Sequence, residues 1–250
     1  MFDLQGKVAL VTGSSRGIGK ALLLGLARCG ATTILHCRKP CPQADTVLEE
    51  AASYGAKCYA VYAELSDHSA AQSVYDQVQA LGLSVDILVL NASVKLRREW
   101  TDITDAEYDL QMDTNFRAPL KLCQLFVPDM QKRRWGRVIT VSSLQQKRPH
   151  QAMMVYAASK CALASMSTSL ATLLAPYGIT VNNIAPGSVR TDRNAEALSD
   201  HDYAEQVRKL IPMEYIGQPE DIVGITVYLA SEESKYMTGQ DIYIDGGKGL

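Results

Sequence analysis

A tyrosine and a lysine four residues apart form the first pair of side chains that could do chemistry. The segment Tyr156-Ala157-Ala158-Ser159-Lys160 is typical of a helix, and positions four apart lie on one helix face. An ammonium about 4 Å from a phenol, in an effective dielectric of about 20, stabilises the phenolate by roughly 4 kcal/mol. That lowers a phenol pKa from about 10 to about 7, so we expect Tyr156 to exchange a proton near neutral pH.

A serine upstream of this pair could hold an oxygen atom on which negative charge develops. Ser142-Ser143 closes the apolar run that starts at Arg137. A hydroxyl there would donate a hydrogen bond to a substrate oxygen and stabilise it. Together with Tyr156, it suits a reaction in which an alkoxide forms and must be protonated.

A glycine-rich turn near the N-terminus could bind a diphosphate. Thr12-Gly13-Ser14-Ser15-Arg16-Gly17-Ile18-Gly19 follows an apolar run and precedes a helical pattern. Gly13 permits a tight turn, Gly17 lets the backbone approach an anion, and Gly19 lets the helix pack close to the strand. The spacing G-x-x-x-G-x-G differs from G-x-G-x-x-G, but the strand before it and the helix after it favour a dinucleotide site over an ordinary turn.

Short apolar runs alternate with helical patterns along the whole chain, as in a parallel sheet built from βαβ units. The near-continuous apolar character of the runs indicates strands that are covered on both faces. The sequence predicts an α/β, Rossmann-type three-layer sandwich in which helices cover both faces of a seven-stranded parallel sheet. The expected strands are Lys7–Thr12, Thr32–Cys37, Cys58–Leu65, Asp86–Asn91, Arg137–Ser142, Thr180–Ile184 and Asp241–Ile244.

Helix signals and one interruption complete this outline. Thr104-Asp105-Ala106-Glu107 forms a capping box, and a helix is expected after Gln218-Pro219-Glu220-Asp221. No linker divides the chain, so we expect one catalytic domain over residues 1–250. Within it, residues 187–212 predict a loop with a short polar helix, an excursion of the kind that serves as a substrate loop.

Composition excludes several classes of function. Lys and Arg number 25 against 27 Asp and Glu, a net charge of −2 that gives no sign of nucleic-acid or membrane binding. No apolar run suits a signal peptide or a membrane span, so we expect a cytoplasmic protein with small-molecule partners. The six cysteines lack C-x-x-C spacing and are expected to be mostly buried free thiols, and the four histidines are not clustered, so no metal site is expected.

Taken together, these motifs resemble the short-chain dehydrogenase/reductase family, in its single-domain branch of roughly 250 residues. The resemblance runs from Lys7-Val8-Ala9-Leu10-Val11-Thr12-Gly13 to Asp245-Gly246-Gly247. The chain is similar to the 3-oxoacyl-carrier-protein reductases and to the glucose- and gluconate-type dehydrogenases of that family. The family's four catalytic positions fall on Asn115, Ser143, Tyr156 and Lys160.

The resemblance also implies a nicotinamide cofactor and the residues that contact it. The family's Asn-Ala-Gly turn and Pro-Gly turn have counterparts here, and its asparagine would hold a water that relays protons to the lysine. The implied cofactor positions are Gly13, Ser15, Arg16, Gly17, Ile18, Gly19, Arg38, Glu64, Leu65, Asn91, Ala92, Ser93, Tyr156, Lys160, Pro186, Gly187, Val189 and Thr191.

Two residues depart from the family pattern, and a third bears on the choice of cofactor. Ser93 replaces the usual glycine, and Glu64 stands where an aspartate is common, so modest effects on cofactor affinity are expected. Arg38 ends the second strand where NAD-preferring members carry an acid. With help from Lys39 or Arg16 it could pair with a 2′-phosphate, so we expect NADP(H), with NAD(H) as an alternative.

The substrate is the least defined part of the prediction. Basic and polar residues line the expected entrance, and they indicate either a solvated rim or a polar or anionic substrate. Four positions are candidate substrate contacts: Ser143, Gln145, Arg148 and His150. Small residues in the helix that continues from Tyr156 allow close helix packing, and the family resemblance implies a homodimer or homotetramer.

Three functions compete at this stage. The leading one is an NADP(H)-dependent carbonyl reductase or alcohol dehydrogenase. The second is a 3-oxoacyl-carrier-protein reductase, although the end of the Tyr156 helix lacks basic residues for carrier docking, and the nearest basic cluster is Lys132-Arg133-Arg134. The third is a catalytically silent dinucleotide-binding sensor or scaffold, which the complete catalytic set argues against.

Overall fold

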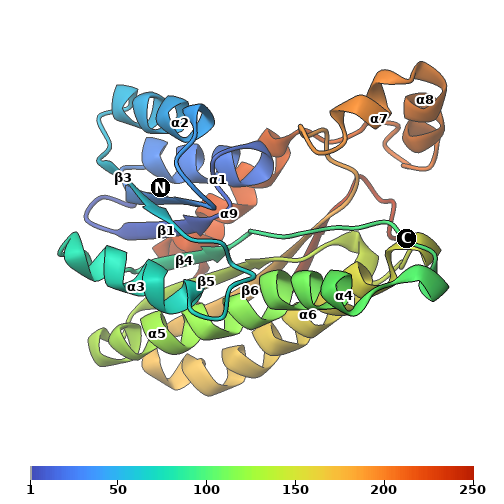
Figure 1. The fold of residues 1–250 in the computed structure, drawn as a ribbon. Coiled ribbons are helices and arrows are strands. Elements are labelled where there is room, and N and C mark those ends of the chain that lie inside the picture. The colour runs from blue at the N-terminus through green and yellow to red at the C-terminus, as the bar shows by residue number, and fades with distance from the viewer. Residues whose placement is uncertain (1) are drawn as a thin grey trace.

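A single parallel sheet organises the molecule, as a computed structural model that describes residues 2–250 shows (Figure 1). Its seven strands lie in the order β3-β2-β1-β4-β5-β6-β7, and each pairs in parallel with its neighbours. This confirms the predicted fold class. The strands are β1 (Val8–Thr12), β2 (Thr32–Cys37), β3 (Cys58–Tyr62), β4 (Ile87–Leu90), β5 (Gly136–Val141), β6 (Ile179–Pro186) and β7 (Asp241–Ile244).

The ends of five of the seven strands differ from the prediction, by one to three residues. β3 stops at Tyr62 rather than Leu65, and β4 is shorter at both ends. β6 runs on to Pro186, which pairs with Ile244 of the edge strand. Apolar composition alone cannot place these ends, because a strand continues only while a neighbouring strand offers hydrogen-bond partners.

Helices cover both faces of the sheet (Figure 1). One face carries α1 (Gly17–Arg28), α2 (Pro42–Ser53) and α9 (Val223–Ala230), and the other carries α3 (Ala70–Ala80), α4 (Asp105–Met112), α5 (Ala118–Arg133) and α6 (Met154–Leu174). Two buried clusters fill the space between the sheet and these helices. Helices α1, α2 and α9 contribute to the first cluster, and helices α3, α5 and α6 contribute to the second.

The excursion between β6 and α9 contains two helices rather than the one expected. These are α7 (Ala195–Ser199) and α8 (His201–Lys209), and they stand away from the sheet in Figure 1. Their own small apolar cluster joins Leu198 to Ile211 and Ile216. An acid explains the split, because the Asp200 side chain accepts a hydrogen bond from the Tyr203 N–H and so begins a new helix.

Two helix starts carry local signals in the sequence, and the structure follows one of them fully and the other in part. The capping box at Thr104 and Glu107 is present and opens α4, as predicted. At Pro219 the chain first forms a 3₁₀ turn, Pro219–Ile222, and becomes α-helical only from Val223. Between α4 and α5 lies a π-helical turn, Asp113–Arg117, which periodicity did not reveal and which is a local form often found at functional sites.

The cysteines agree in part with the prediction. All six cysteines are free, and Cys37 and Cys123 are buried, but Cys161 is exposed on α6. Within residues 2–250, no helix combines the length and the apolar character that crossing a bilayer requires. The same residues bring no three potential metal ligands together.

Candidate active site

The candidate site lies along the carboxyl edge of the central strands. β1 leads into the glycine turn, β4 into Asn91, β5 into Ser143, and β6 into the Pro186-Gly187 turn. The strand order reverses between β1 and β4, because β2 and β3 lie on one side of β1 and the later strands on the other. Ligands of open α/β sheets bind at such a switch point.

The glycine turn leaves room only for backbone. A Cβ on Gly19 would lie 2.3 Å from the Gly13 carbonyl oxygen, and one on Gly13 would lie 2.9 Å from the Ala92 Cα. Gly17 has a φ of +55°, which side chains rarely adopt. The turn therefore keeps a cradle open that larger residues would close, and it fits a dinucleotide diphosphate.

The helix after the turn presents free donors to this cradle. Arg16 is the N-cap residue of α1, its side chain makes no capping hydrogen bond, and the first turn contains no acid. The unpaired N–H groups and the positive end of the helix dipole favour an anion there. Ser15 is half-buried within the turn. The side chain of Ile18 packs against the core and so anchors the first turn of the helix.

A buried histidine holds the glycine turn from below. His36 Nδ1 accepts a hydrogen bond from the Gly13 N–H at 3.2 Å, and Nε2 lies 3.2 Å from the Ala63 carbonyl oxygen. The side chain therefore carries its proton on Nε2. Burial is the main cause that lowers the pKa of His36 to about 4, so the ring is neutral at physiological pH.

The turn after β4 is fastened to the glycine turn. Asn91 Nδ2 donates to the carbonyl oxygens of Thr12 and Gly13 at 2.9 and 3.2 Å. The Thr12 hydroxyl accepts from the N–H groups of Asn91 and Ala92. These bonds join two turns that lie almost eighty residues apart in sequence, so the two cofactor motifs form one rigid surface.

The adenosine end contains an ion pair. Arg38 Nε lies 3.5 Å from Glu64 Oε2, and both side chains are partly exposed. Glu64 thus contacts Nε of the Arg38 guanidinium, while the two terminal nitrogens stay available for a phosphate. The neighbouring Leu65 is buried against Ala92 and Ala118.

The phenol of Tyr156 lies deep in the site beside Ser143. A hydrogen bond from Ser143 lowers the pKa of Tyr156, and the charge of Arg193 also lowers it, but burial is the largest effect and raises it. The predicted lowering of the phenol pKa is therefore wrong for this structure. Desolvation disfavours the phenolate by more than these neighbours restore.

Lys160 is placed differently from the expectation. Its Nζ donates to the Val141 carbonyl oxygen at 2.8 Å, and it lies 5.7 Å from the centroid of the Tyr156 ring. Complete burial, with a smaller contribution from Arg193, lowers the pKa of Lys160 to about 7. The helix spacing correctly puts the two residues on one face, and the lysine lies over the Tyr156 ring, but its hydrogen bond goes to a strand carbonyl rather than to the phenol oxygen.

The side chain of Asn115 acts as a clamp. Its Oδ1 accepts from the Val94 N–H, and its Nδ2 donates to the Val94 carbonyl oxygen, both at 2.8 Å. Nδ2 also donates to the Ser159 hydroxyl at 3.0 Å, and Ser159 lies next to Lys160 in α6. The π-helical turn therefore fixes the segment after β4 against α6. That Asn115 holds a relay water stays a prediction, and any such contact would fall to its main chain.

Ser93, which departs from the family pattern, has a partner across the site. Arg193 Nη1 donates to the Ser93 hydroxyl at 3.2 Å, and Nη2 donates to the Ser93 carbonyl oxygen at 2.7 Å. The two residues come from opposite walls, one after β4 and the other from the excursion after β6. The serine hydroxyl thus helps to fix the excursion over the site.

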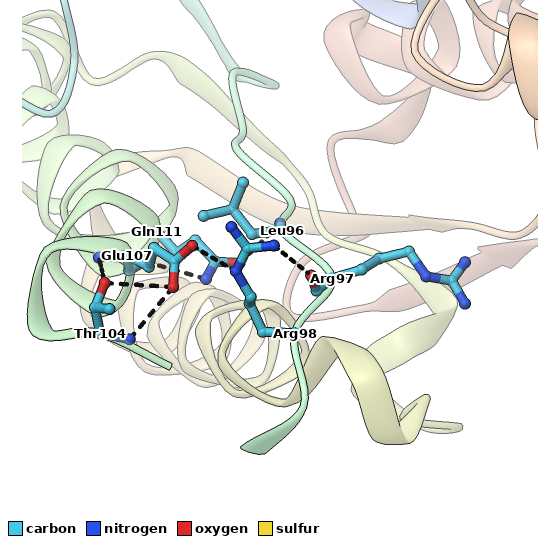
Figure 2. A network of polar contacts seen from close by, with 6 residues as sticks. All are labelled: Leu96, Arg97, Arg98, Thr104, Glu107 and Gln111. Carbon is cyan, nitrogen blue, oxygen red and sulfur yellow. Dashed lines mark hydrogen bonds and ion pairs between the residues drawn. The ribbon is translucent and has the colours of Figure 1, made fainter. Parts of the chain in front are cut away.

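The segment beyond Ser93 is held by a polar network at the start of α4 (Figure 2). Glu107 accepts from Arg98 Nε at 2.6 Å and also closes the capping box with Thr104. The buried Gln111 accepts from the Leu96 N–H at 3.2 Å. The side chain of Arg97 points away from this network in Figure 2, so it is free to face other groups.

The turn after β6 forms the remaining wall. A Cβ on Gly187 would lie 2.6 Å from the Asp245 Cβ, and Val189 is buried and forms a bridge with Gly217. Thr191 is fixed by Asn194, whose Oδ1 accepts from the Thr191 N–H at 2.8 Å. Pro186, Gly187, Val189 and Thr191 therefore lie on the same edge as the glycine turn.

The four candidate substrate residues do not act as one group. Ser143, Gln145 and Arg148 line a cavity of about 240 Å³. His150 is not among the lining residues: its N–H donates to Gln145 Oε1 at 2.7 Å, but its ring faces the Ala152 N–H, at 3.1 Å from Nδ1, and Arg97 Nη2, at 3.4 Å from Nε2. The intervening turn thus sends the side chains of Arg148 and His150 to different places, and the roles of the four residues in substrate binding stay predictions.

Several residues of the site were not identified from the sequence. Sequence spacing could not reveal them, because each reaches the site from a distant segment. One signal was available for Lys248: the turn residues Asp245-Gly246-Gly247 follow the last strand and indicate a fixed loop at the edge of the sheet. The missed residues are Ser159, Asn194, Ser188 and Lys248.

Comparisons with known proteins cover nearly the whole chain. A family model described as enoyl-(acyl carrier protein) reductase matches residues 13–248. A 3-oxoacyl-[acyl-carrier-protein] reductase from Aquifex aeolicus is 33% identical over 245 residues, which make up 98% of this chain and 98% of the relative.

Solved structures are similar over the same span. One is a 3-oxoacyl (acyl-carrier-protein) reductase from Agrobacterium tumefaciens C58 with NADP bound, with a TM-score of 0.94 and 37% identity over 98% of this chain and 95% of that chain. Another is a gluconate 5-dehydrogenase from Burkholderia cenocepacia J2315 in complex with NADP and tartrate. It has a TM-score of 0.92 and 29% identity over 99% of this chain and 96% of that chain.

Proposed function

The chain belongs to the short-chain dehydrogenase/reductase family, and from this premise we propose that it is an NADP(H)-dependent oxidoreductase that interconverts a carbonyl compound and an alcohol. One observation carries the proposal. The cradle formed by the glycine turn lies on the same edge of the sheet as the half-buried Ser143 and the buried Tyr156. A cofactor bound at the first therefore reaches a substrate held at the second.

The protein's own residues bind and protonate the substrate. NADPH, when bound, supplies the hydride. Ser143 donates a hydrogen bond to the substrate oxygen, and Tyr156 gives that oxygen a proton as negative charge develops on it. Lys160, whose pKa of about 7 lets it take up a proton readily at neutral pH, is placed to supply positive charge beside the phenol and the cofactor ribose.

NADP(H) fits the adenosine end better than NAD(H). Glu64 Oε2 lies 3.5 Å from Nε of Arg38, which leaves the two terminal nitrogens of the guanidinium for a phosphate. An Arg fork pairs well with a 2′-phosphate, whereas NAD(H) sites of this fold place a carboxylate at the end of the second strand. The NADP bound in two similar structures supports the same choice.

The choice of carbonyl substrate lies between two relatives. The name of the Aquifex relative favours a 3-oxoacyl-carrier-protein reductase. Against this, the basic cluster Lys132-Arg133-Arg134 is engaged: Lys132 pairs with Asp129, and Arg133 with Asp86. Arg134 donates to the Pro176 carbonyl oxygen. The tartrate in the gluconate 5-dehydrogenase favours a small polar substrate, and we adopt that class.

A panel of substrates tests the proposal. Ketones, sugars, sugar acids and acyl thioesters are offered with NADPH or NADH, and with the oxidised cofactors for the reverse reaction, while absorbance at 340 nm is followed in a general assay of about 1 mM substrate. We expect turnover with NADPH or NADP⁺ and a small polar substrate. Tight NADPH binding without turnover of any substrate would instead support a silent sensor.

We also propose a cytoplasmic homodimer or homotetramer. Large apolar side chains are exposed on the surface, among them Leu173 of α6 and Trp100, which are 65% and 69% exposed. Such residues favour contact with a second copy when they gather in one patch. Light scattering after size exclusion would give a mass of two or four times 27.3 kDa, and a mass of 27.3 kDa would reject the assembly.

A further inference from the structure

The cavity beside Ser143 contains two cations and no acid. Its volume is about 240 Å³, and Arg148 and Lys248 line it together with Gln145 and Leu210. Ligand sites for drug-sized molecules usually measure 300–1,000 Å³, so this cavity suits a small substrate. The remaining lining residues are Leu144, Gly187 and Ser188, and none of the lining side chains is acidic.

Lys248 is held in the cavity without a close carboxylate. Its Nζ donates to the Ser188 hydroxyl at 2.9 Å. Among residues 2–250, no carboxylate oxygen lies within 4.0 Å of this ammonium. Burial lowers the pKa of Lys248, and the more distant Asp245 only partly opposes this. A half-buried ammonium whose hydrogen-bond partner is one neutral hydroxyl is stabilised when an anion binds next to it.

The acid nearest to Lys248 is already engaged. Asp245 Oδ1 accepts from the Gly247 N–H at 2.9 Å, and Oδ2 accepts from the Gly249 N–H at 2.8 Å. These bonds bend the chain end into a turn and direct both carboxylate oxygens to backbone. They leave the Lys248 side chain to point into the cavity.

The turn that carries Lys248 is fixed in place. Gly246 and Gly247 have φ values of +63° and +85°, which favour glycine. A Cβ on Gly249 would lie 2.7 Å from Asp245 Oδ2 and 3.0 Å from a methyl carbon of Leu144. The sequence Gly-Gly-Lys-Gly thus lets the chain end lie against the residue after Ser143.

Arg148 joins the same site from the other wall. Its Nη1 donates to the Lys248 carbonyl oxygen at 2.7 Å, which places the guanidinium beside the lysine backbone. Among the described residues it forms no ion pair with an acid. Its backbone is held by the Leu144 carbonyl oxygen, which accepts from the Arg148 N–H at 2.9 Å. Two cations from segments one hundred residues apart thus converge next to the catalytic serine.

We propose that Lys248 and Arg148 bind a carboxylate of the substrate whose oxygen Ser143 and Tyr156 hold, so that the enzyme acts on small hydroxy acids and oxo acids. The inference rests on the proposed oxidoreductase function and names its substrate class. A carboxylate accepts hydrogen bonds from the planar guanidinium and the ammonium together, and the small cavity leaves no room for a long acyl chain.

Steady-state kinetics with a matched pair of probes test this site. With NADP⁺, D-gluconate is the acidic probe and D-sorbitol the neutral probe. In Lys248→Gln, we expect the ratio of the KM for gluconate to the KM for sorbitol to rise by roughly tenfold or more, because a charge-assisted hydrogen bond is lost. Lys248→Arg should restore most of the preference. Raised salt should increase the KM for gluconate in the wild type.

The control variant is Lys147→Gln, which removes the same charge from the preceding turn. Lys147 is exposed and faces the Tyr243 ring rather than the cavity. This variant should leave the KM ratio unchanged. Thermal melting of all variants excludes a folding defect, and Arg148→Gln provides a second test should Lys248→Gln melt early.

Calorimetry separates failure of the site from failure of the proposed function. Gluconate is titrated into the NADP⁺ complex of the wild type and of Lys248→Gln. Binding that the variant loses supports the carboxylate site even if no alcohol is oxidised, an outcome that would reject the oxidoreductase function alone. Turnover of sorbitol with an unchanged KM ratio in Lys248→Gln would overturn the site and keep the function. A stronger dependence on Lys248 for sorbitol 6-phosphate than for gluconate would overturn the choice of carboxylate.

Discussion

At the residue scale, burial decides the protonation states of the proposed catalytic groups. Tyr156 and Lys160 are buried near the start of α6, where desolvation raises the pKa of the phenol and lowers the pKa of the ammonium to about 7. Both shifts favour the neutral forms. The pair can therefore exchange protons at neutral pH, with Lys160 rather than Tyr156 as the group that titrates there.

Replacing the phenol should stop the reaction and spare the cofactor. Tyr156→Phe removes the proton donor and one ribose contact, so we expect turnover to fall by much more than tenfold while NADPH affinity stays nearly unchanged. Turnover is followed by absorbance and affinity by fluorescence titration. The control Tyr177→Phe, at the far end of α6, should behave as the wild type. A variant that keeps more than about a tenth of kcat would contradict the assignment, since that is less than about 1.4 kcal/mol of lost stabilisation.

Reversing the charge at Arg38 should reverse the cofactor preference. Arg38→Asp puts a carboxylate where we propose that the 2′-phosphate binds, beside Glu64, which already lies 3.5 Å from the arginine. The lost charge-assisted contact amounts to roughly 1.5–3 kcal/mol, and repulsion adds to it. The measurement is the ratio of kcat/KM for NADPH and NADH. Lys57→Asp makes the same change at the opposite edge of the sheet and should leave the ratio as it is. A wild type that already prefers NADH would show that Arg38 has another role.

At the element scale, the ends of strands hold the cofactor turns. β2 contributes His36, which supports the glycine turn between β1 and α1, and the π-helical turn contributes Asn115, which fixes the segment after β4. The neutral state of His36 matters, because only an unprotonated Nδ1 can accept the Gly13 N–H. Strand β2 therefore makes the glycine turn sensitive to acid.

His36 should make stability depend on pH in a defined window. The unfolded ring takes up a proton near pH 6.5, whereas the folded ring does so only near pH 4. Because the unfolded state binds more protons between these values, stability should fall as pH drops from 6.5 to 4, by at most about 3 kcal/mol from this group. Urea unfolding at pH 7.5 and pH 5 should show a smaller loss for His36→Asn than for the wild type. The control is His201→Asn, at an exposed histidine, which should lose as much stability as the wild type. If His36→Asn also loses as much stability as the wild type, His36 is not the cause.

At the scale of the whole molecule, the two edges of the sheet have separate tasks. The carboxyl edge carries the site, and the amino edge carries a structural cluster around Trp135, whose ring lies between Lys7 and Arg137. Arg137 is only 2% exposed and donates to the carbonyl oxygens of Ser231 and Gly136. It ties β5 to the end of α9 without contact with the site.

Loss of this buried arginine should therefore affect stability and not chemistry. Arg137→Ala leaves the Ser231 carbonyl oxygen unsatisfied and opens a cavity, so the free energy of unfolding should fall by about 2–4 kcal/mol. The kcat and KM of the folded fraction should stay close to those of the wild type at 20 °C, a temperature below the expected melting range of roughly 45–65 °C. A change in KM with unchanged stability would mean that the two edges are coupled.

The sequence by itself determined the order of the elements and the residues whose roles depend on local spacing. Apolar runs of strand length between helical patterns predicted all seven strands, and glycines at 13, 17 and 19 predicted the cradle. Both follow from local rules, because a side chain's direction along a strand or helix and a glycine's freedom to turn depend on near neighbours.

Only the tertiary structure decided which distant side chains meet and how they ionise. Lys248 comes to the cavity from the C-terminal turn, Arg193 crosses to Ser93, and Lys160 donates to the Val141 carbonyl oxygen while it lies over the Tyr156 ring. No spacing predicts such contacts, since they depend on how loops fold back over the sheet. The pKa values of Tyr156 and Lys160 follow burial, which is a property of the packed molecule, and this is why charge pairing deduced from helix geometry gave the wrong direction for the phenol.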